Sequence, residues 1–239
     1  MGDLPSFVIP NGLDLRSFGC DGQSRRAFRE KWGIPAAAFV VTSVGRPDPI
    51  KRTSLLIEAL ARVPTGDTDW RALFVGPTDG AETRIWRKLI HDRGIADRVI
   101  WTGTLAGSDL LSAYAASDML CSLSRDENFG MVVIEALACG LPVLATSSVG
   151  VWNEIAEEGV GETTTADPQD IAARIWSAMR SRETWSARGA RGPFLVRERF
   201  SSSRVDSLMV RAFTDILTGQ QSAEGRWANW PRRTSAQGS

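Results

Sequence analysis

The chain has 239 residues, 43% of them hydrophobic and 23% charged, which is typical of a globular protein with one large domain or two small ones. Its 28 basic residues balance its 28 acidic residues, so no bulk charge favours a nucleic acid or an anionic membrane as partner. No run of about 18 apolar residues predicts a transmembrane segment, and the first residues show no signal-peptide pattern.

The cysteines, Cys20, Cys121 and Cys139, form neither a CxxC pair nor the spacing of a zinc site. Their odd number predicts free thiols in a reducing compartment. We therefore expect a cytoplasmic protein, reaching the inner face of a membrane only through a partner or an acceptor.

Four segments of different character follow one another along the chain. Residues 1–20 are an irregular leading segment, and residues 21–200 carry the pattern of one Rossmann-like domain. A further amphipathic helix is predicted within residues 201–218, over Ser203–Leu217. Residues 219–239 are polar and rich in Gly, Ser, Gln and Arg, so we expect a disordered tail.

Short apolar runs alternate with longer amphipathic runs inside the predicted domain. The pattern predicts strands at Phe39–Gly45, Arg71–Gly76, Arg98–Thr102, Met119–Leu123 and Pro142–Ala145, and helices at Thr53–Val63, Ala81–Arg93, Asp109–Ala116, Gly130–Ala138 and Asp167–Arg180. A small-residue loop, Ser147–Glu154, leads into a further short helix. Because parallel strands need crossover connections, this α/β alternation predicts a doubly wound parallel sheet with helices on both faces. Such sheets bind ligands beyond the carboxyl ends of their strands.

A glycine and two cations follow the first predicted strand. Gly45 permits close approach of the backbone to a ligand, Arg46 offers a planar fork for phosphate oxygens, and Lys51 adds a point charge. Two cations beside a helix N-terminus suit a diphosphate. Taken alone, the pair is more simply interpreted as two solvated loop charges.

Two carboxylates follow the fourth predicted strand. Glu127 and Glu135 are separated by about 12 Å along a helix axis, which suits two parts of an extended ligand and is too far for sharing one proton. Between them, Phe129 and Gly130 mark a helix N-terminus whose free N–H groups would face an anion. A solvated helix carboxylate is the alternative for Glu135, although its neighbours in the sequence are apolar.

Two other patterns are read as structural. The string Asp67-Thr68-Asp69 is of the kind that binds manganese elsewhere, but it lies between a predicted helix and the following strand, at the opposite rim, and we interpret it as a turn. His91, the single histidine, lies among charged residues and is expected to face solvent. No metal site is predicted.

Several of these features occur together in one known family. Pro10-Asn11-Gly12-Leu13-Asp14, Gly45-Arg46 with Lys51, and Glu127-Asn128-Phe129-Gly130 with Glu135-Ala136 and Gly140-Leu141-Pro142-Val143 stand in this order. The chain resembles the carboxyl-terminal donor-binding domain of family-4 glycosyltransferases, which have the GT-B architecture of two facing Rossmann-like domains. The resemblance covers about Phe7 to Phe200, and the E-x7-E string with its "FG", "EA" and "G-x-P-V" is highly specific.

The resemblance implies roles for individual residues. Arg46 and Lys51 would hold the diphosphate of a nucleotide-sugar and stabilise the leaving nucleotide, and Glu127 would contact hydroxyls of the transferred sugar. Asn128, Phe129 and Gly130 would line the donor through the loop and its backbone, with Gly45 close to the phosphates. Glu135 would accept hydrogen bonds from the ribose, and Trp101-Thr102-Gly103 would lie near the base. It also implies a retaining reaction with no cofactor and no essential metal.

Two departures and one absence accompany the resemblance. Arg52 stands where the family usually has glycine, and Ser148-Val149-Gly150 stands where it has paired glycines. The donor motifs begin close to Met1, so we expect the acceptor domain either to come from a separate chain or to belong to a longer form of this protein, with Ser203–Leu217 as the helix that crosses to it.

Three functions remain open at this stage. The leading hypothesis is a glycosyltransferase, and the alternative is a nucleotide-sugar-binding module or truncated remnant without turnover of its own. A dinucleotide-dependent oxidoreductase is disfavoured because no G-x-G-x-x-G follows the first strand.

Overall fold

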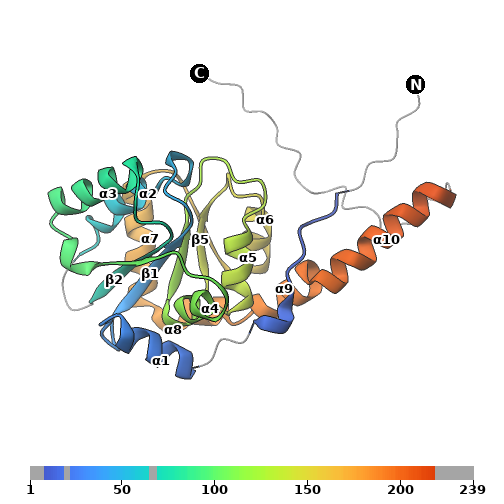
Figure 1. The fold of residues 1–239 in the computed structure, drawn as a ribbon, viewed down its shortest axis with the longest axis horizontal. Coiled ribbons are helices and arrows are strands. Elements are labelled where there is room, and N and C mark those ends of the chain that lie inside the picture. Colours follow the sequence, from blue (N-terminus) through green and yellow to red (C-terminus); the bar gives the residue numbers. More distant parts are fainter. Residues whose placement is uncertain (1–7, 19–21, 65–68, 219–239) are drawn as a thin grey trace, which may run out of the picture.

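Six parallel strands form one sheet in the computed structural model, which describes residues 8–18, 22–64 and 69–218 (Figure 1). The strands are β1 Phe39–Val44, β2 Trp70–Val75, β3 Val99–Gly103, β4 Met119–Ser122, β5 Val143–Thr146 and β6 Gly161–Thr164, in the order β3-β2-β1-β4-β5-β6. The chain therefore winds outward from β1 in one direction and then returns to β4 and winds in the other. This reversal places a crevice at the carboxyl ends of β1 and β4.

Ten α-helices connect or cover these strands in the described residues. They are α1 Gly22–Lys31, α2 Thr53–Leu60, α3 Ala81–Asp92, α4 Gly107–Ala116, α5 Met131–Ala138, α6 Trp152–Glu158, α7 Pro168–Arg180, α8 Arg182–Gly189, α9 Gly192–Phe200 and α10 Ser202–Thr218. Short 3₁₀ turns lie at Leu15–Ser17, Pro49–Lys51 and Ala96–Arg98.

Both faces of the sheet are buried. Phe39 and Val41 of β1 pack into a cluster with α2, α3 and α7, whereas Val40 between them packs on the other face with α1 and α4. This alternation follows from the two-residue period of a strand. The predicted doubly wound α/β sheet is confirmed.

Four elements have no counterpart in the sequence-based prediction: α1, β6, α8 and α9. The β6 sequence Gly-Glu-Thr-Thr lacks the apolar run expected of a buried strand because β6 lies at the edge of the sheet. Helix α1 has few apolar residues, and its arginines Arg25 and Arg29 attach it to the sheet by donating hydrogen bonds to Asp118. Because this contact is polar, the pattern of hydrophobic residues in the sequence does not indicate it.

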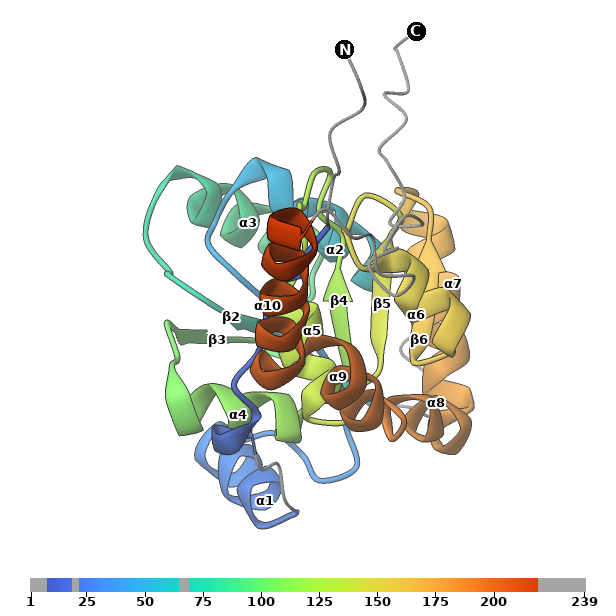
Figure 2. The same ribbon diagram turned by 90° about the vertical axis from the view of Figure 1, so that its right-hand side faces the viewer.

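The leading segment and the carboxyl-terminal helix meet at one point. The Leu13 N–H donates to the Phe200 carbonyl over 2.7 Å, and the Ser202 N–H donates to the Leu13 carbonyl over 2.9 Å. From there α10 extends away from the body of the sheet (Figures 1 and 2). The predicted tail, residues 219–239, and residues 1–7 lie outside the described residues.

The expectation of free thiols is wrong for Cys139, which is disulfide-bonded. It holds for Cys121, a buried free thiol on β4 whose pKa is raised by burial. Cys20 lies outside the described residues. In the part of the chain that the structure describes, no helix has both the length and the apolar character needed to span a bilayer.

Candidate functional site

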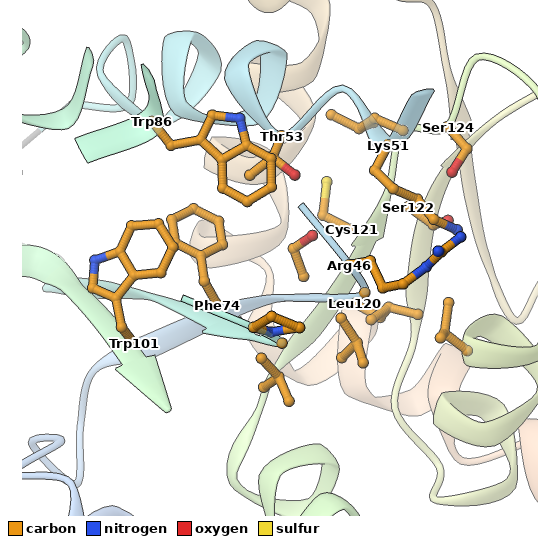
Figure 3. A pocket seen from close by; sticks show the side chains of 18 residues that line it. Arg46, Lys51, Thr53, Phe74, Trp86, Trp101, Leu120, Cys121, Ser122 and Ser124 are labelled. Atoms are coloured by element: carbon orange, nitrogen blue, oxygen red, sulfur yellow. The ribbon is translucent and has the colours of Figure 1, made fainter. Parts of the chain in front are cut away.

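A pocket opens at the carboxyl ends of β1, β2 and β4, beside the N-terminus of α2 (Figure 3). Arg46 and Lys51 point toward one end of this pocket, where Ser122 ends β4 and Ser124 follows it. The opposite end is aromatic and is formed by the side chains of Phe74, Trp86 and Trp101. The pocket therefore has a cationic end and an apolar end.

The cationic end depends on a glycine contact between two neighbouring strands. Gly45 and Gly76 follow β1 and β2 with φ of 152° and 153°, and the Gly45 N–H donates to the Val75 carbonyl over 2.9 Å. A Cβ on Gly76 would lie 2.0 Å from the Gly45 carbonyl oxygen, so only glycine fits there. This turn leaves Arg46 exposed, with no hydrogen bond or ion pair to any described residue.

Lys51 is held at the end of a short 3₁₀ turn. Asp48 caps this turn by accepting a hydrogen bond from the Ile50 N–H over 2.9 Å. Arg52 follows with φ of 51°, in the left-handed region that favours glycine, at the position where the resembled family usually has glycine. The backbone at Arg52 is therefore strained, because a residue with a side chain adopts this conformation less readily than glycine.

Lys51 and Glu127 form an ion pair across the pocket. The Lys51 Nζ lies 2.5 Å from the Glu127 Oε2, and the two side chains are 26% and 22% exposed. Each partner is partly shielded from water, so the attraction is stronger than between fully exposed charges. The pair joins the segment before α2 to the loop after β4.

The loop that carries Glu127 is fixed by backbone hydrogen bonds on both sides. The Glu127 N–H donates to the Ser148 carbonyl over 3.1 Å, and the Gly150 N–H donates to the Glu127 carbonyl over 2.9 Å. A Cβ on Gly150 would lie 2.1 Å from the Asn128 carbonyl oxygen. The single glycine of Ser148-Val149-Gly150 therefore stands at the position where the loops touch.

The residues between the two glutamates divide between core and surface. The Phe129 side chain is buried and packs edge-on against Phe200 of α9, with ring centroids 5.7 Å apart. Gly130 caps α5 with φ of 99°, and Asn128 is exposed. Phe129 and Gly130 can therefore meet a ligand only through backbone groups at the start of α5.

Glu135 is half-buried in the middle of α5. Its Oε2 accepts a hydrogen bond from the Tyr114 hydroxyl of α4 over 2.8 Å. Burial raises the pKa of Glu135, and the Tyr114 hydrogen bond lowers it in part. Burial and the neighbouring carboxylate also raise the pKa of Tyr114, which stays a donor at all ordinary pH values.

The structure brings only some of the sequence-predicted residues together at the pocket. Gly45, Arg46 and Lys51 line the pocket, and Glu127 joins them through Lys51. Thr102, Gly103, Asn128, Phe129, Gly130 and Glu135 do not line it. Thr102 instead donates its hydroxyl hydrogen bond to the Gly103 carbonyl over 2.8 Å.

Sequence reasoning missed Phe74 and Trp86 at the aromatic end of the pocket and also Tyr114, whereas the resemblance had named the segment of Trp101 as lying near the base. Trp86 and Trp101 stack with centroids 6.4 Å apart and planes 11° apart. The apolar positions of Phe74 on β2 and Trp86 on α3 are typical of core residues, so no local pattern marks these two as pocket residues. One general rule could have pointed to Tyr114: a buried tyrosine on a helix needs an acceptor for its hydroxyl.

Of the two patterns read as structural, the solvent exposure of His91 is confirmed, whereas the Asp67-Thr68-Asp69 string is described only at Asp69. Asp69 pairs with Arg71 and Arg98 before β2, at the edge of the sheet away from the pocket, whereas Asp67 and Thr68 lie outside the described residues. The His91 side chain is 87% exposed. No group of three potential metal ligands occurs within residues 8–18, 22–64 and 69–218.

Comparison with known proteins agrees with the geometry. The family model described as glycosyl transferases group 1 matches residues 24–192. A D-inositol 3-phosphate glycosyltransferase of Geodermatophilus obscurus is 33% identical over 230 residues, which cover 92% of this chain and 50% of that protein. The chain spans about half the length of such relatives.

Solved structures show the same fold. Anabaena HepE, in complex with UDP and glucose, is 26% identical with a TM-score of 0.78, covering 87% of this chain and 56% of that one. The C-terminal domain of LpcC, a group 1 family protein of Francisella tularensis, is 24% identical with a TM-score of 0.69, covering 80% of this chain and 100% of that one. These matches identify the fold as a carboxyl-terminal GT-B domain. Because the family model covers more than half of its residues, the chain belongs to the group 1 glycosyl transferases.

Proposed function

We propose that this chain is the donor-binding half of a retaining, family-4-type glycosyltransferase that takes a hexose from a nucleoside-diphosphate sugar. The observation that carries the proposal is the arrangement of Arg46, Lys51 and Glu127 at the carboxyl ends of β1 and β4. Two cations and one carboxylate at this crevice match the charges of a diphosphate and the hydroxyls of a sugar. The family membership and the UDP and glucose bound by HepE support this choice of donor.

In this proposal the chain acts mainly through electrostatics. Arg46 and Lys51 hold the diphosphate and stabilise the negative charge that grows on it as the glycosidic bond breaks. Glu127 accepts hydrogen bonds from the transferred sugar, and Glu135 accepts them from the ribose. The two cations supply the charge that a metal ion would otherwise provide, so the proposal includes no cofactor.

A second half that binds the acceptor is part of the proposal. Met209, Val210, Phe213, Ile216 and Leu217 of α10 are apolar and from 43% to 85% exposed. An exposed apolar surface of this kind is typical of a helix that packs on another domain. We place the acceptor half, supplied by a separate chain, against α10, and we place the resulting complex in the cytoplasm.

The test is calorimetric titration of the purified chain with UDP, GDP, UDP-glucose and NAD, without metal. We expect one nucleoside-diphosphate series to saturate, and Arg46→Ala to weaken it by about 1.5–3 kcal/mol because a charge-assisted contact is lost. Lys88→Ala, which removes an exposed lysine of α3 paired with Asp92, is the matched control and should bind like the wild type. Saturable binding of NAD alone, or no nucleotide binding by a folded chain, would contradict the proposal.

A further inference from the structure

The hydrogen bond between Tyr114 and Glu135 connects a core side chain to a proposed ligand-binding carboxylate. Tyr114, the only tyrosine of the sequence, is 1% exposed and lies on α4. Its hydroxyl donates to the Glu135 Oε2 over 2.8 Å. The bond therefore crosses from α4 to α5 and fixes one oxygen of the carboxylate.

No cation shares Glu135 with Tyr114. Among the described residues, neither lysine nor arginine forms an ion pair with Glu135, and the Oε1 atom accepts no hydrogen bond from them. A half-buried carboxylate without a cation is destabilised by the loss of hydration. The Tyr114 hydroxyl is thus the group that both stabilises the charge of Glu135 and sets its direction.

The Tyr114 ring cannot turn away from this position. It belongs to the same buried cluster as Ile134 and Ala136, which flank Glu135, and as Leu120 of β4. Close packing holds such a side chain in one rotamer. A carboxylate with one oxygen bound to a fixed donor presents its second oxygen in a defined direction, as recognition of a hydroxyl requires.

We propose that Tyr114 is a positioning residue for the ribose of the donor: it holds Glu135 so that the Oε1 atom accepts hydrogen bonds from the ribose hydroxyls. This inference rests on the proposed function, because it takes Glu135 as the ribose contact. It adds a residue that does not line the pocket and does not touch the donor itself.

A purely structural role makes a different prediction. A buried tyrosine hydroxyl needs an acceptor, and Glu135 could serve only that need. In that case Tyr114 would respond equally to every nucleotide that binds. The decisive comparison is therefore between a ribonucleotide and the same nucleotide without its 2′- and 3′-hydroxyls.

The first readout uses the wild-type chain and the fact that its sequence holds one tyrosine. Tyrosine labelled with ¹³C at Cζ gives a single resonance that reports the hydrogen bond of the Tyr114 hydroxyl. We expect saturating UDP, or GDP if that series binds, to shift this resonance. The 2′,3′-dideoxy analogue should saturate the protein without the shift.

The second readout is affinity. Tyr114→Phe keeps the packed ring and removes only the donor, so the fold is retained. We expect the variant to bind the ribonucleoside diphosphate about five to ten times more weakly, the equivalent of one ordinary hydrogen bond, because Tyr114 acts on the ribose only through Glu135. It should bind the dideoxy analogue as the wild type does. Glu135→Gln, which keeps Tyr114 intact, should show the same selective loss.

The outcomes separate the two proposals. Equal shifts with both nucleotides, or an equal change in affinity for both in Tyr114→Phe, would overturn the positioning role and leave the proposed function standing. Failure of both UDP and GDP to bind the folded wild-type chain would overturn the proposed function and this inference with it. A selective loss for the ribonucleotide supports both.

Discussion

At the residue scale, Lys51 and Glu127 neutralise each other across the pocket, although they are assigned to different parts of the donor. A diphosphate and Glu127 therefore compete for the same ammonium group. The same ion pair keeps the Glu127 carboxylate close to the phosphate position. Binding of the phosphates and binding of the sugar are consequently linked through this pair.

The competition gives a prediction for Glu127→Gln. Removing the carboxylate charge frees Lys51, so UDP should bind about three to ten times more tightly, as expected for a partly buried ion pair of about 1 kcal/mol. UDP-glucose should gain less than UDP, because the variant loses the acceptor for the sugar. Isothermal titration at one ionic strength measures both.

The matched control is Glu183→Gln, which makes the same change of charge on α8. Glu183 is exposed and lines a different pocket, at the opposite edge of the sheet. Weaker binding of UDP to Glu127→Gln than to this control would show that Glu127 assists the phosphate site.

A second prediction concerns Glu154, a buried carboxyl on α6. Its Oε2 atom is buried without a hydrogen-bond partner in the described structure, and burial raises its pKa. A raised pKa in the folded state means that the charged form opposes folding, so this cost is present at high pH and disappears as pH falls toward the ordinary glutamate pKa.

Glu154→Gln should therefore raise the free energy of unfolding by about 1 kcal/mol at pH 8 and by less at pH 5. Urea denaturation at the two pH values measures this difference. A variant that is destabilised equally at both would show that the carboxylate is paired in solution.

At the element scale, the two edges of the sheet have different roles. The carboxyl edge carries the pocket, whereas the amino edge is closed by Asp118, just before β4. Asp118 accepts hydrogen bonds from Arg25, Arg29 and Arg182 at 2.8–2.9 Å. These arginines also donate to backbone carbonyls, so α1, α8 and the start of β1 are joined at one carboxylate.

Asp118→Asn should destabilise the fold by about 3 kcal/mol, because removal of one partner leaves buried guanidinium charge unpaired. Chemical denaturation measures the loss. Asp97→Asn, at an exposed aspartate without an ion pair in the described structure, is the control. UDP affinity measured below the unfolding transition should be unchanged in both, since the pocket lies at the other edge. A large loss of affinity in folded Asp118→Asn would show that the edges are coupled.

The difference between apolar periodicity within a segment and contacts between distant residues explains how much of this fold the sequence predicts. Strands β1 to β5 and helices α2, α3, α5 and α7 were predicted because their apolar periodicity is strong, and so the sheet and its carboxyl edge were predicted correctly. Helix α1 was missed because Arg25 and Arg29 bond to Asp118, which is far away in sequence.

The candidate site shows the same limit. Arg46, Lys51 and Glu127 could be nominated because each follows a strand end, but no sequence pattern indicates that Lys51 and Glu127 touch. The Tyr114–Glu135 contact is likewise unpredictable from periodicity, because it depends on how α4 and α5 are placed relative to each other.

At the scale of the whole molecule, α10 is only partly packed against the rest of the chain. Val205, Leu208 and Ala212 pack on the body, whereas Val210 and Phe213 on other sides of the helix are 66% and 61% exposed. Figure 1 shows the helix continuing from α9 and leading away from the sheet. Its apolar surface therefore exceeds what this chain covers with its described residues.

We expect this surface to make the isolated chain self-associate at high concentration. Val210→Glu with Phe213→Glu should shift the chain toward monomer in sedimentation velocity and leave UDP affinity unchanged, because both residues are remote from the pocket. Identical sedimentation of variant and wild type would show that α10 is covered in another way.

The contact of Leu13 with Phe200 and Ser202 has a consequence for the way this domain can be rebuilt. Residues 13 and 202, which flank the part of the chain that forms the sheet, lie side by side. The backbone between them therefore almost closes into a ring. A short linker could join residue 202 to residue 13, and new termini could then be opened in an exposed loop. Such a circular permutant would keep every strand pairing while detaching α10, and would allow the donor site to be studied on a body without that helix.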